Sequence, residues 1–274
     1  MSNQSQISQS IDDAYFTKDD SVEFCHAVLR QHGWLSGSIL EPCVGSGNLI
    51  KGLNATAFDI NDYGYPLDWQ GNFLDYNEDR SWDLVFTNPP FGRAGSLAGK
   101  VINHSAKFTD RLAFILPQSF RKISLIDRID RNFHPVADYS LPTEYYTLPN
   151  GTERHVKTCF QLWERRDYKR MKFNETPYTE FFTRVDKPDA EYAFRTQGAS
   201  AGTILNGIDH TPASTAFLVG GKSLVAKHDW TKIAKFSAAI PAIGLHDVAW
   251  GLRSSNINNY LQHGILSELI DYAK

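Results

Sequence analysis

The residues with the clearest chemical signature are Asn88, Pro89, Pro90 and Phe91, which directly follow an apolar stretch of the chain. Consecutive prolines fix the backbone and remove two N–H donors, so the loop is rigid and presents mainly acceptors. The side-chain oxygen of Asn88 and the carbonyl oxygen of Pro89 can both accept hydrogen bonds from a planar amine. Such bonds draw the nitrogen lone pair out of conjugation, and Phe91 can stack on the ring that carries the amine. The four residues therefore predict a catalytic site that activates an amine nitrogen.

A glycine-containing segment precedes that loop and predicts a binding function. Residues 41–48 read Glu-Pro-Cys-Val-Gly-Ser-Gly-Asn and lie between an expected strand at 38–40 and an expected helix at 49–53. Glycines let the backbone approach a ligand closely, and a helix start offers free N–H groups to a negative group. Asp59 follows 14 residues after Gly45, where a carboxylate can bind both hydroxyls of a ribose. The loop lacks the third glycine of the dinucleotide fingerprint, but its pairing with a spaced acid predicts a ligand that contains a ribose.

Strands and helices alternate across the first part of the chain and must position these two loops. Short apolar runs rich in β-branched and aromatic residues predict strands at 38–40, 55–59, 84–87 and 112–116. Apolar spacing between or after these runs predicts helices at 21–31, 49–53, 100–108 and 119–133. This alternation is typical of a parallel α/β sheet with helices on both faces. Around Pro-Asn-Gly at 149–151, the stretches 144–148 and 155–164 predict an antiparallel hairpin.

The regular alternation stops near residue 166, after which turn residues become frequent. We therefore expect a flexible tail at 1–11 and a catalytic domain at 12–166. The remaining residues, 167–274, are expected to form a smaller strand-rich domain that reads a substrate and ends in a helix at 257–273.

Two further glycine-rich segments carry predictions of their own. Residues 92–99 are expected to form a loop, either a mobile one that closes over a nucleic-acid strand or a plain surface loop. Gly220-Gly221-Lys222-Ser223 matches the end of a phosphate-binding loop, but Phe-Leu-Val precedes the glycines and 223–226 reads as a strand. We interpret the two glycines as a hairpin turn and do not expect an ATPase.

The net charge of −3 conceals an uneven distribution. Residues 1–91 hold four Lys or Arg against thirteen Asp or Glu, whereas residues 92–135 hold eight against three. The basic stretch directly follows the Asn-Pro-Pro-Phe loop and could bind a polyanion, although solvated helix faces would give the same composition. The candidate phosphate contacts are Arg121, Lys122, Arg128 and Arg131.

Composition excludes several classes of protein. A hydrophobic fraction of 42% is too high for a disordered chain, and no run approaches the roughly 18 apolar residues of a membrane span. The first ten residues are polar and do not resemble a secretory signal. Cys25, Cys43 and Cys159 and the nine histidines are scattered, so we expect a cytoplasmic protein without a metal site. The Pro42-Cys43 pair lies in the glycine loop, so a cysteine nucleophile of the cytosine-C5 type is not expected.

The motifs together resemble a known enzyme family. Glu-Pro-x-x-Gly-x-Gly at 41–47, the acid Asp59 and Asn-Pro-Pro-Phe at 88–91 are similar to the class I S-adenosylmethionine-dependent amino-methyltransferases. Within that class the best resemblance is to the N6-adenine DNA methyltransferases. Phe16 and Thr17 resemble the family segment that contacts the methionine end of the cofactor. Because this segment comes first, then the glycine loop, then Asn-Pro-Pro-Phe and an added domain, the order is that of the gamma group, and the resemblance covers about residues 12–166.

The resemblance implies a Rossmann-like sheet of seven strands, parallel except for an antiparallel terminal hairpin, and it implies S-adenosylmethionine as cofactor. Glu41, Cys43 and Gly45 would line its methionine end, Asp59 would hold the ribose and Ile60 would pack on the adenine. The full set of expected cofactor residues is Phe16, Thr17, Glu41, Pro42, Cys43, Gly45, Gly47, Asn48, Asp59, Ile60, Asn72, Phe73 and Asn88. Asn72 stands where the family has an acid that binds the amino group of the cofactor adenine.

The function implied by the resemblance is methyl transfer to the N6 amine of adenine in DNA, with the base flipped out and stacked on Phe91. The loop chemistry suits any planar amine, so adenine in RNA, the glutamine amide of a protein, and a silent nucleic-acid-binding partner remain alternatives. The recognition sequence, strandedness, oligomeric state and biological role, whether restriction companion, solitary enzyme or viral enzyme, stay open.

Overall fold

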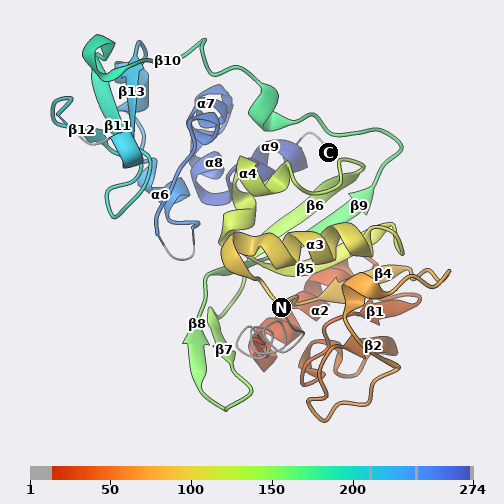
Figure 1. The fold of residues 1–274 in the computed structure, drawn as a ribbon. Helices are drawn as coiled ribbons and strands as arrows, with labels where there is room; N and C mark the ends of the chain where they lie inside the picture. The colour runs from red at the N-terminus through yellow and green to blue at the C-terminus, as the bar shows by residue number, and fades with distance from the viewer. Residues whose placement is uncertain (1–13, 210–211, 238–239, 272–274) are drawn as a thin grey trace. The chain divides into compact units, whose positions relative to one another are not determined.

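The computed structural model describes residues 14–209, 212–237 and 240–271 (Figure 1). These residues form two compact units, each with its own core. Unit 1 comprises the described residues up to Pro117 together with Ile129–Lys169, and unit 2 comprises Gln118–Arg128 and the described residues from Arg170 onward. The chain therefore passes from unit 1 to unit 2 and back before it enters unit 2 a second time.

Unit 1 is built on a sheet of seven strands in the order β3-β2-β1-β4-β5-β9-β6. Its strands are β1 (Ile39–Glu41), β2 (Ala55–Asp59), β3 (Trp69–Gln70), β4 (Leu84–Thr87), β5 (Arg111–Pro117), β6 (Phe133–Ser140) and β9 (Thr158–Arg165). The first five in chain order pair in parallel, and β9 lies between β5 and β6 and runs antiparallel to both. The predicted fold class, a Rossmann-like methyltransferase sheet with an antiparallel end, is confirmed by this strand order.

The register of the central strands brings their carboxyl ends to one edge. In the parallel ladders Ile39 lies opposite Ala55 on β2 and opposite Leu84 on β4. All four residues of β4 are buried, as expected for a parallel strand that is covered on both faces. The loops after β1, β2 and β4 therefore leave the sheet at the same edge, which is where parallel α/β sheets bind ligands.

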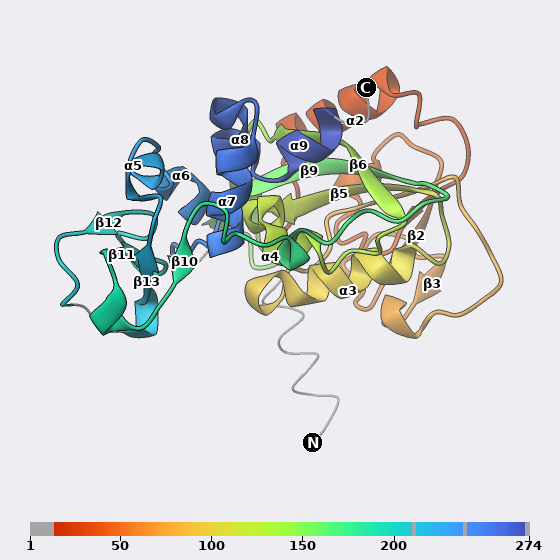
Figure 2. The same cartoon turned by 90° about the horizontal axis from the view of Figure 1, so that it is seen from above.

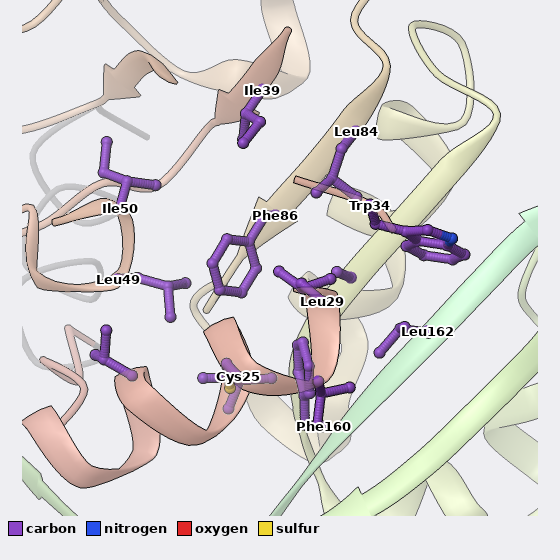
Figure 3. Close-up of a cluster of buried hydrophobic side chains, with 14 of the residues drawn as sticks. Cys25, Leu29, Trp34, Ile39, Leu49, Ile50, Leu84, Phe86, Phe160 and Leu162 are labelled. Atoms are coloured by element: carbon purple, nitrogen blue, oxygen red, sulfur yellow. The ribbon is translucent and has the colours of Figure 1, made fainter. Parts of the chain in front are cut away.

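Two helices cover opposite faces of this sheet, α2 (Asp19–Gln31) and α3 (Ser96–Ser105) (Figure 2). Acidic residues in the first turn of α2 and an arginine in its last turn complement the helix dipole. Its apolar stripe is buried against the strands, and Figure 3 shows Cys25 and Leu29 directed toward Phe86 of β4 and Phe160 of β9. This packing fixes β4, and with it the Asn-Pro-Pro-Phe loop that follows.

Three helix or loop predictions between residues 49 and 133 are wrong. In place of the helix expected at 119–133, the structure has the 3-10 turn η4 (Gln118–Arg121), the short helix α4 (Ile123–Ile126) and turns at 127–132, before β6 begins at Phe133. The register of β6 shifts between Pro135 and Ala137, and a proline is tolerated because β6 is an edge strand. The helix expected at 49–53 is only the 3-10 turn η1 (Asn48–Ile50). Residues 96–99, expected in a loop, begin α3, with Gly95 at φ 73° preceding it.

The predicted hairpin exists, but its second strand is interrupted. Strand β7 (Tyr145–Thr147) pairs with β8 (Glu153–His155) in a sheet of its own, while the chain resumes at Thr158 as β9 in the main sheet. The Asn-Gly turn forms as expected, with Gly151 at φ 82° and the Asn150 side-chain oxygen accepting from Thr152 N–H at 3.0 Å. Hairpin β7–β8 contacts the N-terminal segment, because Phe16 and Thr147 exchange backbone hydrogen bonds.

Unit 2 contains an antiparallel sheet in the order β10-β13-β11-β12, followed by short helices. Besides η4 and α4, its described elements are η5 (Phe173–Glu175), β10 (Thr183–Arg184), η6 (Lys187–Asp189), β11 (Tyr192–Arg195), β12 (Ile204–Leu205), η7 (Pro212–Ser214), β13 (Thr215–Val219), α5 (Lys222–Val225), α6 (Thr231–Ala234), α7 (Leu245–Arg253), α8 (Ile257–His263) and α9 (Leu266–Asp271). This small sheet confirms the strand-rich addition in the predicted fold class. Among the described residues, no helix is long and apolar enough to cross a membrane.

Two local predictions for unit 2 are wrong. The strand expected at 223–226 is helix α5, and Gly220 and Gly221 connect it to β13 through two consecutive positive φ angles rather than through a hairpin turn. Helix α5 is a single turn of four residues, too short to present the phosphate-binding N-terminus that an ATPase loop needs. The expected terminal helix is divided into α8 and α9 at Gly264, which has φ 61°. Residues 1–11, expected to be a tail, lie outside the described residues.

Candidate active site

A cavity of about 910 Å³, including its open mouth, lies at the carboxyl edge of the unit 1 sheet. Its walls come from the N-terminal segment, the loops after β1, β2, β3 and β4, and helix α3. The predicted cofactor residues that line it are Phe16, Thr17, Glu41, Pro42, Cys43, Gly45, Asn48, Asp59, Ile60, Asn72, Phe73 and Asn88. Of the four predicted catalytic residues, Asn88 and Pro90 line the cavity, whereas Pro89 and Phe91 do not.

Gly47 also lies outside the cavity wall, and it serves the loop instead. A Cβ atom there would meet the Tyr65 ring at 1.9 Å, so glycine allows the loop after β1 to pass this side chain. Gly45 has φ 54°, and a Cβ atom there would lie 3.0 Å from the Phe16 ring. Both positions require glycine because a Cβ atom would meet a neighbouring aromatic ring, but only Gly45 lines the cavity.

Asp59 ties two of the loops together. It is buried, its Oδ2 accepts a hydrogen bond from Gly45 N–H at 2.8 Å and its Oδ1 accepts from Asn61 N–H at 2.9 Å. Burial raises the pKa of Asp59, and the hydrogen bonds from these backbone amides oppose that rise. Since each carboxylate oxygen has two lone pairs, both oxygens can accept a further bond from a ligand in the cavity.

Glu41 is a buried carboxyl group with incomplete hydrogen bonding. Its Oε1 accepts from Cys43 N–H at 3.0 Å, while its Oε2 is buried and has no hydrogen-bond partner. Desolvation by burial raises the pKa of Glu41 from 4.5 to about 8. It also raises the pKa of the neighbouring Cys43 thiol, which therefore stays protonated. A buried oxygen without a partner indicates that a donor from a ligand is missing, and an ammonium group would be the strongest such donor.

The side-chain amide of Asn88 is held in one orientation. Its Nδ2 donates to the Tyr15 carbonyl oxygen at 2.9 Å and to Thr17 Oγ1 at 3.1 Å. A backbone carbonyl can only accept, so the nitrogen of the amide must face Tyr15 and the oxygen must point the other way. This Oδ1 is buried and has no hydrogen-bond partner. The site therefore contains a fixed acceptor with no donor bound to it.

Phe91 does not present an open face for stacking. It is 6% exposed, and the Tyr15 ring lies on it with the centroids 5.4 Å apart and the planes 16° apart. A base that stacks on Phe91 therefore requires the Tyr15 ring to move. Tyr15 was not among the predicted site residues, because it lies far from Phe91 along the chain.

The position that resembles the adenine-binding acid of the family is Asn72. Its Oδ1 accepts from Leu74 N–H at 3.2 Å and caps the 3-10 turn η2 (Phe73–Asp75). One lone pair of this oxygen remains for a ligand. On the neighbouring loop Ile60 is 41% exposed, so an apolar side chain at the cavity is available to pack on a flat ring.

Sequence reasoning also missed several cavity residues. Leu97 and Val101 lie four positions apart on α3 and form an apolar wall, a spacing that indicates one helix face. Tyr63 lines the cavity as well and packs edge-on against Phe16, with ring centroids 5.4 Å apart. The helical spacing of Leu97 and Val101 was readable, whereas nothing local marks Tyr63.

Two of the four predicted phosphate contacts are wrong. Arg121 and Lys122 are only 2% and 8% exposed and belong to the interior of unit 2. Lys122 Nζ donates to Ser237 Oγ at 2.8 Å and to the Ala242 carbonyl at 2.7 Å, and the Arg121 guanidinium lies 5.7 Å from the centre of the Phe236 ring. Their charges are used inside the fold, whereas Arg128 and Arg131 are not buried. Within the part of the chain that the structure describes, no three His, Cys, Asp or Glu side chains gather as a metal site.

Comparisons with known proteins give distant structural similarity only. No family model and no curated protein matches the sequence. Among solved structures, one similar chain is a protein of Pyrococcus horikoshii inferred to be an RNA methyltransferase, with a TM-score of 0.44, 12% identity, and 56% of this chain and 87% of that chain covered.

Two further solved structures have similar TM-scores and low sequence identities. A protein of Listeria monocytogenes inferred to be a class I S-adenosylmethionine-dependent methyltransferase has a TM-score of 0.43 and 18% identity, with 57% of this chain and 63% of that chain covered. The modification subunit of an inferred type I restriction enzyme from Vibrio vulnificus has a TM-score of 0.42 and 12% identity, with 56% and 45% covered. The fold assignment rests on the strand order of unit 1 itself, and the chain has the class I methyltransferase fold.

Proposed function

We propose that the protein transfers a methyl group from S-adenosylmethionine to the N6 amine of adenine in DNA. The observation that carries this proposal is the Asn88 amide. Its nitrogen is fixed by Tyr15 and Thr17, and its oxygen is a buried acceptor without a donor. An amine hydrogen of a flat heterocycle is the donor that this acceptor lacks.

The cavity residues fit the proposed cofactor. Glu41 Oε2, which has no partner, would accept from the ammonium of the methionine part, and Asp59 would accept from the ribose hydroxyls. Ile60 would pack on the adenine ring, and the remaining lone pair of Asn72 would accept from its amino group. A Cβ atom at position 45 would crowd the Phe16 ring. Glycine therefore leaves room for the cofactor beside this ring.

The reaction needs little from the protein beyond position and hydrogen bonding. S-adenosylmethionine supplies a methyl group on a sulfonium, which is a good leaving group. Asn88 Oδ1 and the Pro89 carbonyl would accept the two amine hydrogens, which localises the lone pair on nitrogen and directs it toward the methyl group. The rigid prolines hold both acceptors in place, so most of the rate would come from orientation. As the carbon–sulfur bond breaks, the methylated nitrogen becomes cationic and acidic, so the proton that it loses can pass to water without a strong general base.

DNA is favoured over other amine substrates by the order of the motifs and by the addition of unit 2 after the hairpin. Arg128 and Arg131 remain candidates for phosphate contacts, since both belong to the basic stretch after the Asn-Pro-Pro-Phe loop. Arg121 and Lys122 are excluded from this role by their burial. Unit 2 would supply the surface that reads the substrate.

The test is transfer of tritium from labelled S-adenosylmethionine to duplex DNA, single-stranded DNA and RNA in parallel, with nucleoside digestion of the product. N6-methyladenine from DNA is the expected result. Label in RNA alone would keep the chemistry and correct the substrate. Label in neither, with cofactor binding shown by calorimetry, would overturn the proposal and direct the search to protein amides or to a silent binding partner.

A further inference from the structure

The Tyr15 ring covers the surface on which the target base is proposed to stack. Its centroid lies 5.4 Å from that of Phe91, within the roughly 4.5–7 Å range of direct aromatic contact, so no third ring fits between them. Tyr15 also lines the cavity, whereas Phe91 does not. Of these two aromatic side chains, Tyr15 is therefore the one that a ligand in the cavity can reach.

Other aromatic and cationic side chains of unit 1 also contact the ring of Tyr15. Tyr146 packs edge-on against it with centroids 6.0 Å apart, and the Arg154 guanidinium carbon lies 5.8 Å from its centre. Both neighbours come from hairpin β7–β8, where Arg154 is exposed and Tyr146 is buried. Each such contact is worth only about 0.5–1.5 kcal/mol, so an incoming base can compete with them.

The backbone of Tyr15 has a separate task. Its carbonyl oxygen accepts from Asn88 Nδ2 at 2.9 Å, and Phe16 next to it exchanges two hydrogen bonds with Thr147. Rotation about the side-chain bonds of Tyr15 moves the ring and leaves these backbone bonds in place. The ring can thus leave Phe91 while the Asn88 amide keeps its orientation.

We infer that the Tyr15 ring occupies the face of Phe91 that the target base takes, and that the base enters by displacing it. This inference rests on the proposed function. Tyr15 is a positioning residue in this scheme: it keeps Phe91 out of water until a base replaces it, and its stacking energy is subtracted from the affinity for DNA. Removing the ring therefore strengthens base capture.

The first test compares Tyr15→Ala with the wild-type protein in steady-state methylation of DNA. With S-adenosylmethionine saturating, we expect KM for DNA to fall about three- to tenfold, the range given by one aromatic contact. Tyr15→Phe, which keeps the ring, should restore the wild-type KM. The matched control is Tyr145→Ala, which removes an exposed tyrosine of β7 outside the cavity. An unchanged or higher KM in Tyr15→Ala would overturn the inference.

A second measurement does not depend on the folding of an alanine variant. The protein is labelled with 3-fluorotyrosine, and the fluorine resonance of Tyr15 is assigned as the one that Tyr15→Phe lacks. On addition of the oligonucleotide dA12 with S-adenosylhomocysteine, that resonance should shift, and addition of dT12 should leave it in place. A resonance that stays unchanged at saturating dA12 would show that the ring does not move and would refute the inference.

The two proposals fail in different ways. If the wild-type protein transfers no methyl group to adenine in DNA, the proposed function is wrong and the displacement of Tyr15 by a DNA base falls with it. If the wild-type protein methylates DNA but neither the KM nor the fluorine resonance responds as described, only the role of Tyr15 is wrong.

Discussion

Glu41 in unit 1 and Asp247 in unit 2 are both buried carboxyl groups whose pKa is raised by desolvation, but their partners differ. Asp247 Oδ1 accepts from Ile123 N–H at 3.1 Å and Oδ2 accepts from Gly244 N–H at 3.0 Å, and the charge of Lys122 stabilises it. Glu41 has one amide donor, and its second oxygen has none.

The comparison separates two uses of a buried charge. Every carboxylate oxygen of Asp247 is satisfied by the protein itself, so this group connects residues 118–128 to the rest of unit 2. Glu41 is incomplete, and so is Asn88, whose Oδ1 lies in the loop after β4. A satisfied buried charge indicates a structural role, and a group of unsatisfied polar atoms around one cavity indicates a missing ligand.

The largest effect is expected from breaking the unit 2 arrangement. Lys122→Met removes the hydrogen bonds from Lys122 Nζ to Ser237 Oγ and the Ala242 carbonyl, together with a positive charge that stabilises Asp247. Since each hydrogen bond from a charged donor contributes about 1.5–3 kcal/mol, the free energy of unfolding should fall by about 3–5 kcal/mol. Urea denaturation followed by circular dichroism measures this loss. Lys172→Met is the control, because Lys172 forms an exposed ion pair with Glu175 at 2.9 Å and should lose less than about 1 kcal/mol. Equal losses in both variants would contradict the structural role of Lys122.

Next in size is the effect of removing the unsatisfied acceptor of unit 1. Asn88→Ala should lower kcat by about 10²–10³-fold, the usual loss when one transition-state hydrogen bond is removed. Cofactor affinity, measured by calorimetry, should change by less than about threefold. Asn103→Ala is the control, since its Oδ1 accepts from Asp130 N–H away from the cavity. Full turnover in Asn88→Ala would exclude the proposed role of the loop.

Glu41 should make cofactor binding depend on pH. The carboxylate must be ionised to pair with an ammonium, and the pKa of Glu41 without ligand is about 8. Affinity should therefore rise with pH, by up to about tenfold per unit, until pH 8 and then level off. Glu41→Gln should remove this dependence and weaken binding at pH 8 by about 10- to 100-fold, since it removes a charged hydrogen bond. Calorimetry from pH 6 to 9 measures both effects.

Glu41→Gln also tests how the ionisation of Glu41 changes the free energy of unfolding. A folded-state pKa above the unfolded value of 4.5 favours the protonated form in the fold. The free energy of unfolding of the ligand-free protein should therefore fall as pH rises from about 4.5 to about 8. In Glu41→Gln this part of the pH dependence should disappear, and an identical slope in both proteins would mean that Glu41 is not the group responsible.

The smallest effect is expected at Asn72. Asn72→Asp should raise cofactor affinity about two- to fivefold, because a charged acceptor binds an amino group more strongly than an amide oxygen. Its capping bond to Leu74 N–H is kept in the aspartate variant. Asn72→Ala, which also loses the cap, is the comparison. Weaker binding in Asn72→Asp than in the native protein would show that this side chain does not face the cofactor.

The sequence was most informative where structure is local. Strands 55–59 and 84–87 were predicted with the bounds that the structure has, because each is a short apolar run. Most of the predicted cofactor residues could be expected to lie together, because the carboxyl ends of neighbouring parallel strands meet at one edge of the sheet. The same geometry predicts that Asp59, at the end of β2, lies near Gly45 in the loop after β1. Asp59 Oδ2 does accept a hydrogen bond from Gly45 N–H.

Long-range packing could not be predicted. From the sequence alone, a lysine such as Lys122 is expected at the surface. Only its hydrogen bonds to Ser237 and Ala242 show that it is buried. The stack of Tyr15 on Phe91 likewise joins residues far apart in the chain. Strand β6 was not predicted from the sequence, because its hydrogen bonds are made with β9, which follows later, so no local pattern specifies its pairing.

The route of the chain between the units has a consequence for how this protein can be cut and recombined. Residues 118–128 leave unit 1 after β5 and return before β6, and Phe120, Ile123 and Ile126 are buried in the whole chain. A truncation after residue 169 would remove their partners and expose an apolar segment in the middle of the remaining piece. Unit 2 therefore cannot be exchanged as one continuous fragment of the chain. During synthesis, moreover, the seven-stranded sheet lacks an inner strand until β9 has left the ribosome.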